Sequence, residues 1–210
     1  MNRAFLALLI ASIILFNSCS TLENSDDSEL NKNIIDATSA FNDGDYNKAE
    51  ELFSTALQID EDNEIALNNQ ILTLNKLDKN TEALELANQA LKAYPDNLKF
   101  QIIKARLLKT LKKNNESILL YQKILKLTTH EKYYHVEYLQ YLLTLDFQND
   151  TKIKQYIIDE AEYLLSNNFA EKEALKALCI VDRNNLVYSL ILKTKYNSQW
   201  NEVYNVNGVK

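Results

Sequence analysis

Glycine and proline are scarce in this sequence of 210 residues, which contains only two Gly and one Pro. Folds with many tight β-turns depend on these residue types, whereas helices joined by short polar turns need few of them. The scarcity therefore predicts an all-α protein. The length allows one globular domain or roughly four to six helical hairpins of about 34 residues each.

An excess of basic charge is also missing, because 29 Asp and Glu outnumber 23 Lys and Arg and give a net charge of −6. Proteins that bind nucleic acid broadly use Lys and Arg to displace counterions from phosphates. We therefore expect no nucleic-acid partner. The apolar fraction of 46% is ordinary for a folded protein and excludes wholesale disorder.

Residue types that carry catalysis are sparse as well. His130 and His135, the only histidines, lie five residues apart, which is not the spacing that brings two metal ligands together on a helix. Gly44 and Gly208, the only glycines, cannot form a Gly-rich phosphate loop. Cys179 lies in an apolar run, where a buried, protonated thiol is expected. The sequence predicts no catalytic residue, no metal site and no cofactor, and hence no enzyme.

An uncharged apolar run occupies residues 4–16, directly after the single basic residue Arg3. This run would make about 20 Å of helix, too short for the roughly 30 Å core of a bilayer but suited to a signal peptide. Ser18 and Cys19 follow, and this junction resembles the bacterial lipobox, in which the cysteine is acylated and becomes the new N-terminus. The family prefers Leu where this chain has Phe16. An ordinary signal peptide with an incidental Cys, or an uncleaved anchor, therefore stays open as an alternative.

The lipobox resemblance implies a signal peptide over residues 1–18, an acylated Cys19, and a flexible acidic tether over residues 19–29. Such a tether reaches roughly 30 Å when extended. Acylation would leave Cys179 without a disulfide partner, so that stability would come from packing alone. The expected location is the cell envelope, lipid-anchored to the outer membrane. Whether the chain faces the periplasm or the outside stays open.

A pattern of small and large apolar residues recurs every 34 residues. Its members follow one another at steps of four, three and one, which places them on one face of a helix. The small members allow two helices to approach closely, and the larger ones fill the space beside them. The three copies are Ala49, Phe53, Ala56 and Leu57; Ala83, Ala87, Ala90 and Leu91; and Ser117, Tyr121, Ile124 and Leu125.

Residues 43–57 resemble the second helix of a tetratricopeptide repeat, with Gly in the turn, Tyr46, two Ala and an aromatic between them. The next copy adds Pro95, which usually ends such a repeat because Pro lacks a backbone N–H. The chain departs from the family at Glu61, where Pro would be usual, and in lacking a large aromatic early in the first helix. The resemblance implies a right-handed α-solenoid of helical hairpins over residues 30–195, with a degenerate C-terminal cap.

Five helical pairs are expected. The first three keep the 34-residue register, and the fourth loses it at a turn with extra residues over 146–151. The fifth is degenerate, because a terminal unit must cover the solenoid end with a polar outer face. The tail, residues 196–210, is expected either to fold back across this cap or to stay loose. The pairs are 31–42 with 46–60, 64–77 with 81–94, 97–112 with 115–128, 131–144 with 152–166, and 170–181 with 186–195.

In tetratricopeptide solenoids the first helix of each pair lines a concave groove that binds peptides or partner helices. Lys99, Arg106 and Lys109 lie at steps of seven and three in one such helix and share one face. On an acidic protein this basic patch would attract an acidic peptide or a carboxylate; a solvated face that binds nothing is the alternative. The groove residues that the resemblance implies are Asn68, Asn75, Lys76, Lys99, Arg106, Lys109, Tyr133 and Gln140.

The implied function is an adaptor or scaffold that binds another envelope protein or a peptide. One alternative is an envelope lipoprotein that binds glycan or peptidoglycan, which Tyr133, Tyr134 and Trp200 would favour if they met in one pocket. Another is an accessory subunit of a membrane enzyme. The stripe Tyr134, Tyr138 and Tyr141, at steps of four and three, is expected to pack against neighbouring helices instead of binding a ligand.

Overall fold

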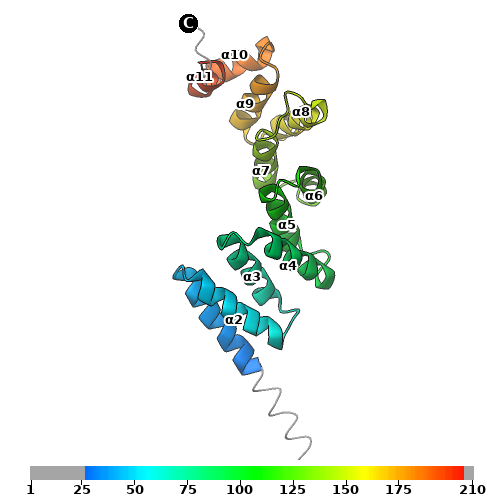
Figure 1. Ribbon diagram of the computed structural model, residues 1–210. Coiled ribbons are helices and arrows are strands. Elements are labelled where there is room, and N and C mark those ends of the chain that lie inside the picture. Colours follow the sequence, from blue (N-terminus) through cyan, green and yellow to red (C-terminus); the bar gives the residue numbers. More distant parts are fainter. Residues whose placement is uncertain (1–26, 206–210) are drawn as a thin grey trace, which may run out of the picture. The chain divides into compact units, whose positions relative to one another are not determined.

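The computed structural model describes residues 27–205. The predicted signal peptide, Cys19 and residues 19–26 of the tether lie outside the described residues. The prediction of a flexible tether as far as residue 29 is wrong at its end, because residues 27–29 belong to the first helix. Every regular element within 27–205 is a helix (Figure 1). None of these helices is both long enough and apolar enough to cross a bilayer.

The helices form two compact units, and the boundary between Leu120 and Tyr121 falls within α6. From α2 onward, each predicted helix boundary lies within two residues of the observed one, up to the end of α10. The elements are a helix at residues 27–42, followed by α2 (Tyr46–Ile59), α3 (Glu64–Lys76), α4 (Asn80–Ala93), α5 (Leu98–Thr110), α6 (Asn114–Leu127), α7 (Lys132–Leu142), α8 (Thr151–Ser166), α9 (Glu171–Val181), α10 (Leu186–Lys195) and α11 (Asn197–Asn205).

Short polar turns separate the helices of unit 1, which comprises the described residues up to Leu120. Asn63 and Asn97 cap α3 and α5, where each side chain accepts a hydrogen bond from backbone N–H groups of the first turn. The turns between paired helices each contain one residue with positive φ, and these residues recur every 34 positions. They are Gly44, Asp78 and Lys112, with φ of 83°, 58° and 57°.

The core of unit 1 is built from the predicted repeat. Ala49, Phe53 and Ala56 in α2 are completely buried, as are Ala83, Ala87 and Ala90 in α4. The small side chains let α4 lie close to α3 and α5, and larger side chains from those two helices fill the remaining space. The cluster comprises Leu67, Ile71, Leu74, Ala83, Leu84, Ala87, Ala90, Phe100, Ile103, Leu107 and Leu108.

Unit 2, the described residues from Tyr121 onward, departs from the 34-residue register, as predicted. The segment between α7 and α8 runs over residues 143–150, whereas only residues 111–113 separate α5 from α6. As a result the buried residues of α8, which are Ile157, Ala161 and Leu164, fall two positions later than an unbroken repeat would place them. The extra residues in this turn are therefore the cause of the lost register.

The tail folds back as far as residue 205, because α11 packs against α9 and α10. Val203 is buried, and Trp200 stacks on Tyr204 with ring centroids 5.0 Å apart. The indole N–H of Trp200 also donates to Ser189 Oγ at 3.0 Å. Cys179 is completely buried in this cluster, which confirms its predicted structural place.

Candidate functional site

Three of the residues predicted to line a groove meet in one hollow of unit 1. Asn75 and Lys76 come from α3, and Arg106 comes from α5. The hollow has a volume of about 290 Å³. We call it the unit 1 hollow. Besides these three residues it is lined by Ile71, Leu72, Ile103, Leu107 and Thr110.

Two properties of α3 produce this surface. Its inner face buries Leu67 and Ile71 against α4, which fixes the direction of the opposite face. That opposite face carries Ile65, Leu72 and Lys76 at steps of seven and four. Ile65 and Leu72 are 59% and 37% exposed, so apolar surface remains accessible beside the hollow. The helix therefore presents an apolar stripe that ends in a positive charge.

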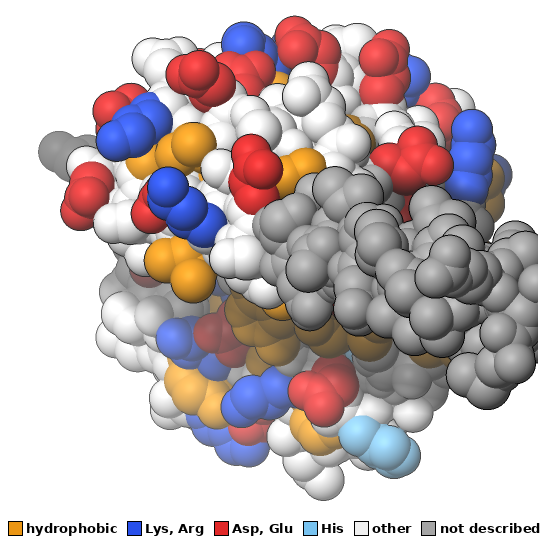
Figure 2. Space-filling model, turned by 90° about the horizontal axis from the view of Figure 1, so that it is seen from below, with side chains coloured by type: hydrophobic (Ala, Val, Ile, Leu, Met, Phe, Trp, Pro, Cys, Tyr) orange, Lys and Arg blue, Asp and Glu red, His pale blue; other side chains and the backbone are white. Residues whose placement is uncertain are grey.

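The unit 1 hollow has a positive electrostatic character, because Lys76 and Arg106 line it and none of its lining residues is acidic. Asn75 donates its side-chain N–H to Asn80 Oδ1 at 2.7 Å, which fixes the orientation of its amide. Elsewhere charges of both signs are mixed: Figure 2 shows acidic and basic side chains scattered over one face of the molecule. A local basic site on a chain of net charge −6 favours an acidic ligand.

The remaining predicted groove residues lie elsewhere. Lys99 and Lys109 are exposed on α5, outside the lining of the hollow. Asn68 is only 5% exposed, because its place on α3 faces the interior, where its amide donates to Asn69 Oδ1 at 2.8 Å. It offers little surface to a ligand. In unit 2, Tyr133 and Gln140 are exposed on α7.

The three aromatic residues that would favour a glycan site do not converge. Trp200 belongs to the cluster of α9, α10 and α11. Tyr133 lies on α7 and packs edge-on against Tyr134, with ring centroids 5.5 Å apart. The predicted tyrosine stripe does pack internally, since Tyr138 and Tyr141 are each 2% exposed. Both rings lie within 6 Å of the Tyr121 ring. This confirms the packing role expected for these two tyrosines.

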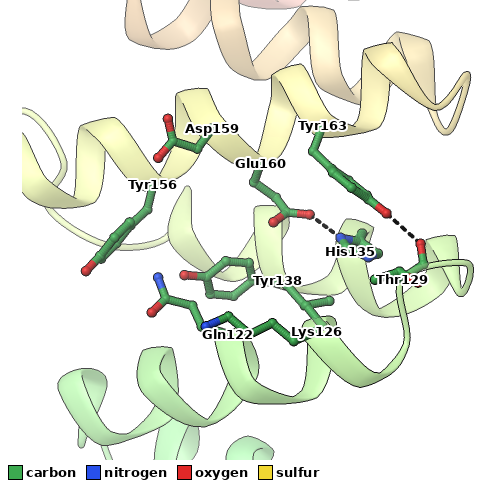
Figure 3. A pocket seen from close by; sticks show the side chains of 10 residues that line it. Gln122, Lys126, Thr129, His135, Tyr138, Tyr156, Asp159, Glu160 and Tyr163 are labelled. Carbon is green, nitrogen blue, oxygen red and sulfur yellow. Dashed lines mark hydrogen bonds and ion pairs between the residues drawn. The ribbon is translucent and has the colours of Figure 1, made fainter.

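A second cavity lies within unit 2, between α6, α7 and α8 (Figure 3), and has a volume of about 430 Å³. We call it the unit 2 cavity. Aromatic rings and two carboxylates from α8 dominate its lining. The lining residues are Gln122, Leu125, Lys126, Thr129, His135, Tyr138, Tyr156, Asp159, Glu160 and Tyr163.

A buried pair forms one wall of this cavity. His135 Nδ1 lies 2.6 Å from Glu160 Oε1, and the two side chains are 4% and 11% exposed. The imidazole stacks on Tyr163, with ring centroids 4.4 Å apart. Tyr163 in turn donates its O–H to the carbonyl oxygen of Thr129 at 2.6 Å. The ring, the carboxylate and the turn before α7 are therefore held in one arrangement (Figure 3).

The pairing of His135 with Glu160 was not among the features predicted from the sequence. His135 lies three and seven residues before Tyr138 and Leu142, both buried, so helical spacing could have placed its ring inside. Glu160 lies between buried Ile157 and Ala161 on α8, which is the corresponding signal. Their pairing across 25 residues depends on the length of the turn between α7 and α8, and no local pattern encodes it.

Groups that could support catalysis or metal binding are limited in the described residues. No cluster of three or more His, Cys, Asp or Glu residues suited to a metal ion occurs within residues 27–205. Burial raises the pKa of the Cys179 thiol, which keeps it in the unreactive protonated form. The described residues thus offer binding surfaces in both units.

Comparison with solved structures shows the fold. A tetratricopeptide repeat protein from Parabacteroides merdae is similar with a TM-score of 0.68 and 15% identity, over 85% of this chain and 73% of that chain. The MamA protein matches with a TM-score of 0.65 and 12% identity, over 84% and 92% of the two chains. A TPR repeats protein from Bacteroides fragilis matches with a TM-score of 0.50 and 19% identity, over 82% and 81%.

These similarities confirm the predicted fold class, a tetratricopeptide-like α-solenoid. No protein-family model matches the sequence, and no curated protein is significantly similar to it. At identities this low the similarity extends to the fold alone. Function must therefore be argued from the surfaces of this chain.

Proposed function

We propose that this protein is an adaptor of the bacterial cell envelope that binds a protein partner in the unit 1 hollow. The observation that carries the proposal is the meeting of Lys76 and Arg106 over an apolar floor that includes Leu72 and Ile103. An amphipathic segment with acidic side chains would match such a surface, because its apolar face would cover the floor and its carboxylates would pair with the two cations.

The size of the surface favours a protein segment over a small molecule. The hollow itself is small, but exposed Ile65 and Leu72 extend the apolar stripe along α3. Contiguous apolar surface with a polar rim is typical of protein interaction sites. The structurally similar proteins named above include two described as tetratricopeptide repeat proteins, and repeats of this class commonly serve as binding scaffolds.

The membrane part of the proposal rests on the sequence. Acylation of Cys19 would hold the chain at the outer membrane, and a tether over residues 19–26 would let the helical part reach a partner nearby. One acyl chain holds a protein at a membrane only weakly, whereas two or more chains anchor the protein stably. The anchor would raise the local concentration of the adaptor beside a membrane-bound partner.

Affinity capture after crosslinking of intact cells tests the proposal. The test variant carries Lys76→Glu and Arg106→Glu, and the matched control carries Lys99→Glu and Lys109→Glu, the same charge change outside the hollow. We expect a specific partner to be captured by wild type and the control but reduced at least tenfold with the test variant, with circular dichroism unchanged. A partner captured equally by all three proteins would refute a role for the hollow.

A Cys19→Ala variant tests the anchor separately. We expect metabolic labelling with a fatty acid to mark the wild-type protein and to leave Cys19→Ala unlabelled, and we expect the variant to leave the membrane fraction. Equal labelling of both proteins would remove the lipid anchor from the proposal. The hollow would be unaffected by that result.

A further inference from the structure

The unit 2 cavity combines an aromatic lining with a buried carboxylate. Its volume of about 430 Å³ lies within the range of natural ligand sites. Rings of Tyr138, Tyr156 and Tyr163 line it from two helices, and Glu160 extends between them from α8 (Figure 3). A pocket of this kind accepts a ligand group that is flat or slender and compatible with aromatic faces.

Glu160 is the group that determines which ligand fits. Its side chain is 11% exposed, and the hydrogen bond from His135 involves only Oε1. The second oxygen, Oε2, makes no hydrogen bond or ion pair within residues 27–205. Withdrawing a carboxylate from water is costly unless its charge and lone pairs are matched. A cationic donor in the cavity would supply both the charge and the missing hydrogen bond.

The surroundings of Glu160 also favour a cation. Burial raises the pKa of Tyr138, so this phenol keeps its proton and adds no competing negative charge. Asp159 contributes a second carboxylate at the exposed side of the cavity, where Lys126 is the one Lys or Arg of the lining and is also exposed; His135, on the buried wall, already contacts Glu160 Oε1. Tyr156 already attracts a cation, because Lys152 Nζ lies 5.8 Å from its ring centroid. Carboxylates and tyrosine faces together are a favourable environment for a basic side chain.

We infer that the unit 2 cavity is a receptor for an Arg or Lys side chain presented by a partner protein. The guanidinium or ammonium group would donate to Glu160 Oε2, and the alkyl stem would lie along the tyrosine rings. This inference rests on the proposed adaptor role only because the Arg or Lys side chain belongs to a partner protein. The unit 2 cavity would bind a basic group, whereas the unit 1 hollow would bind an acidic one.

A pair of synthetic peptides tests the inference without any knowledge of the partner. One is a blocked pentapeptide with Arg between pairs of glycines, and the other replaces Arg with citrulline, its neutral isostere. Binding is followed on the isotope-labelled protein, from residue 20 onward, by shifts of the backbone amide resonances of α7 and α8. We expect the Arg peptide to bind at least fivefold more tightly than the citrulline peptide, and added salt to reduce the difference.

Variants locate the binding within the cavity. Glu160→Gln keeps an oxygen that accepts from His135 but removes the charge, and we expect it to abolish the preference for Arg over citrulline. Glu162→Gln is the matched control, because it makes the same change on an exposed face of α8 outside the cavity. It should bind like wild type. If Glu160→Gln fails to fold, Tyr156→Leu takes its place, and we expect at least a threefold loss of affinity for the Arg peptide.

Three outcomes would overturn the inference. The first is equal binding of the Arg and citrulline peptides. The second is an undiminished Arg preference in Glu160→Gln or, where that variant does not fold, undiminished Arg affinity in Tyr156→Leu. The third is a neutral oligosaccharide, chitotriose, shifting the same resonances while the Arg peptide does not, which would assign the cavity to a glycan. None of these outcomes involves Lys76 or Arg106, so the capture experiment on the unit 1 hollow succeeds or fails independently.

Discussion

The two units use the same repeat position in different ways. Phe53, Ala87 and Tyr121 occupy equivalent places 34 residues apart, and all three are completely buried. In unit 1, Phe53 packs in a cluster with Ala37, Ala40 and Ala49, and these small side chains let the helices lie close together. In unit 2, Tyr121 packs against two more tyrosines and donates its O–H to Glu137 at 2.7 Å. The same repeat position is thus packed by small alanines in unit 1 and by aromatic rings in unit 2.

Their binding surfaces differ accordingly. The unit 1 hollow lies on the outer faces of two regular helices and is basic, with Lys76 and Arg106 in its lining. The unit 2 cavity lies between α6, α7 and α8, of which α8 has lost the 34-residue register, and its buried charge is the carboxylate of Glu160. The unit 1 hollow thus lies where the repeat is regular, and the unit 2 cavity lies beside the helix at which the repeat is broken. The comparison also separates two partner chemistries, acidic for the hollow and basic for the cavity.

The largest expected effect comes from emptying the equivalent core positions. We expect Phe53→Ala and Tyr121→Ala each to lower the free energy of unfolding by about 3–5 kcal/mol, through lost burial and the cavity left behind. Hydrogen exchange should rise mainly in residues 27–120 for Phe53→Ala and in residues 121–205 for Tyr121→Ala. If either variant accelerates hydrogen exchange equally in both segments, the two units open together and do not unfold independently.

Replacing a glycine in a turn of unit 1, and introducing one in a turn of unit 2, compares the backbone strain of the two turns. Gly44 has φ of 83° and no atom near the place of an added Cβ, so Gly44→Ala would meet backbone strain alone, which we expect to cost about 1 kcal/mol of stability. Ala170, which precedes α9, has φ of 43° without being glycine. We expect Ala170→Gly to stabilise unit 2 by up to ~1 kcal/mol. Thermal unfolding measures both, and a stabilising Gly44→Ala would contradict the assigned strain.

The smallest expected effect concerns an exposed ion pair that joins α9 to α10. Hydrogen bonds from Lys195 and then Tyr196 hold the pKa of Glu171 below its usual value of 4.5. A lowered carboxyl pKa adds stability above the unfolded-state value, and this stability is lost as pH falls below about 4.5 through the folded-state pKa. We expect wild type to melt slightly above Glu171→Gln at pH 6, with the difference vanishing by pH 3. A difference that persists at pH 3 would assign the effect to packing.

Much of unit 1 could be predicted from its sequence because its interactions are local and periodic. The 34-residue repeat of small and large residues set which faces are buried, and the structure adds that Asn63 and Asn97 cap the starts of α3 and α5. Of the residues that this register assigned to a groove, Asn75, Lys76 and Arg106 line one hollow, and whether that hollow binds a partner stays a prediction. Asn68 lies seven residues before Asn75 and therefore on nearly the same helix face, yet it is buried, because its exposure depends on the neighbouring helices and not on helical spacing alone.

Sequence alone therefore determined the all-helical fold and, from α2 to α10, the boundaries of the helices to within two residues. These follow from periodicity, capping and composition, which act within one helix or between neighbours. Tertiary structure alone decided the pairing of His135 with Glu160, the aromatic cavity around them and the seating of Trp200 against Tyr204. Those contacts join residues whose separation depends on a turn of irregular length, and packing fixes them only when the whole unit has formed.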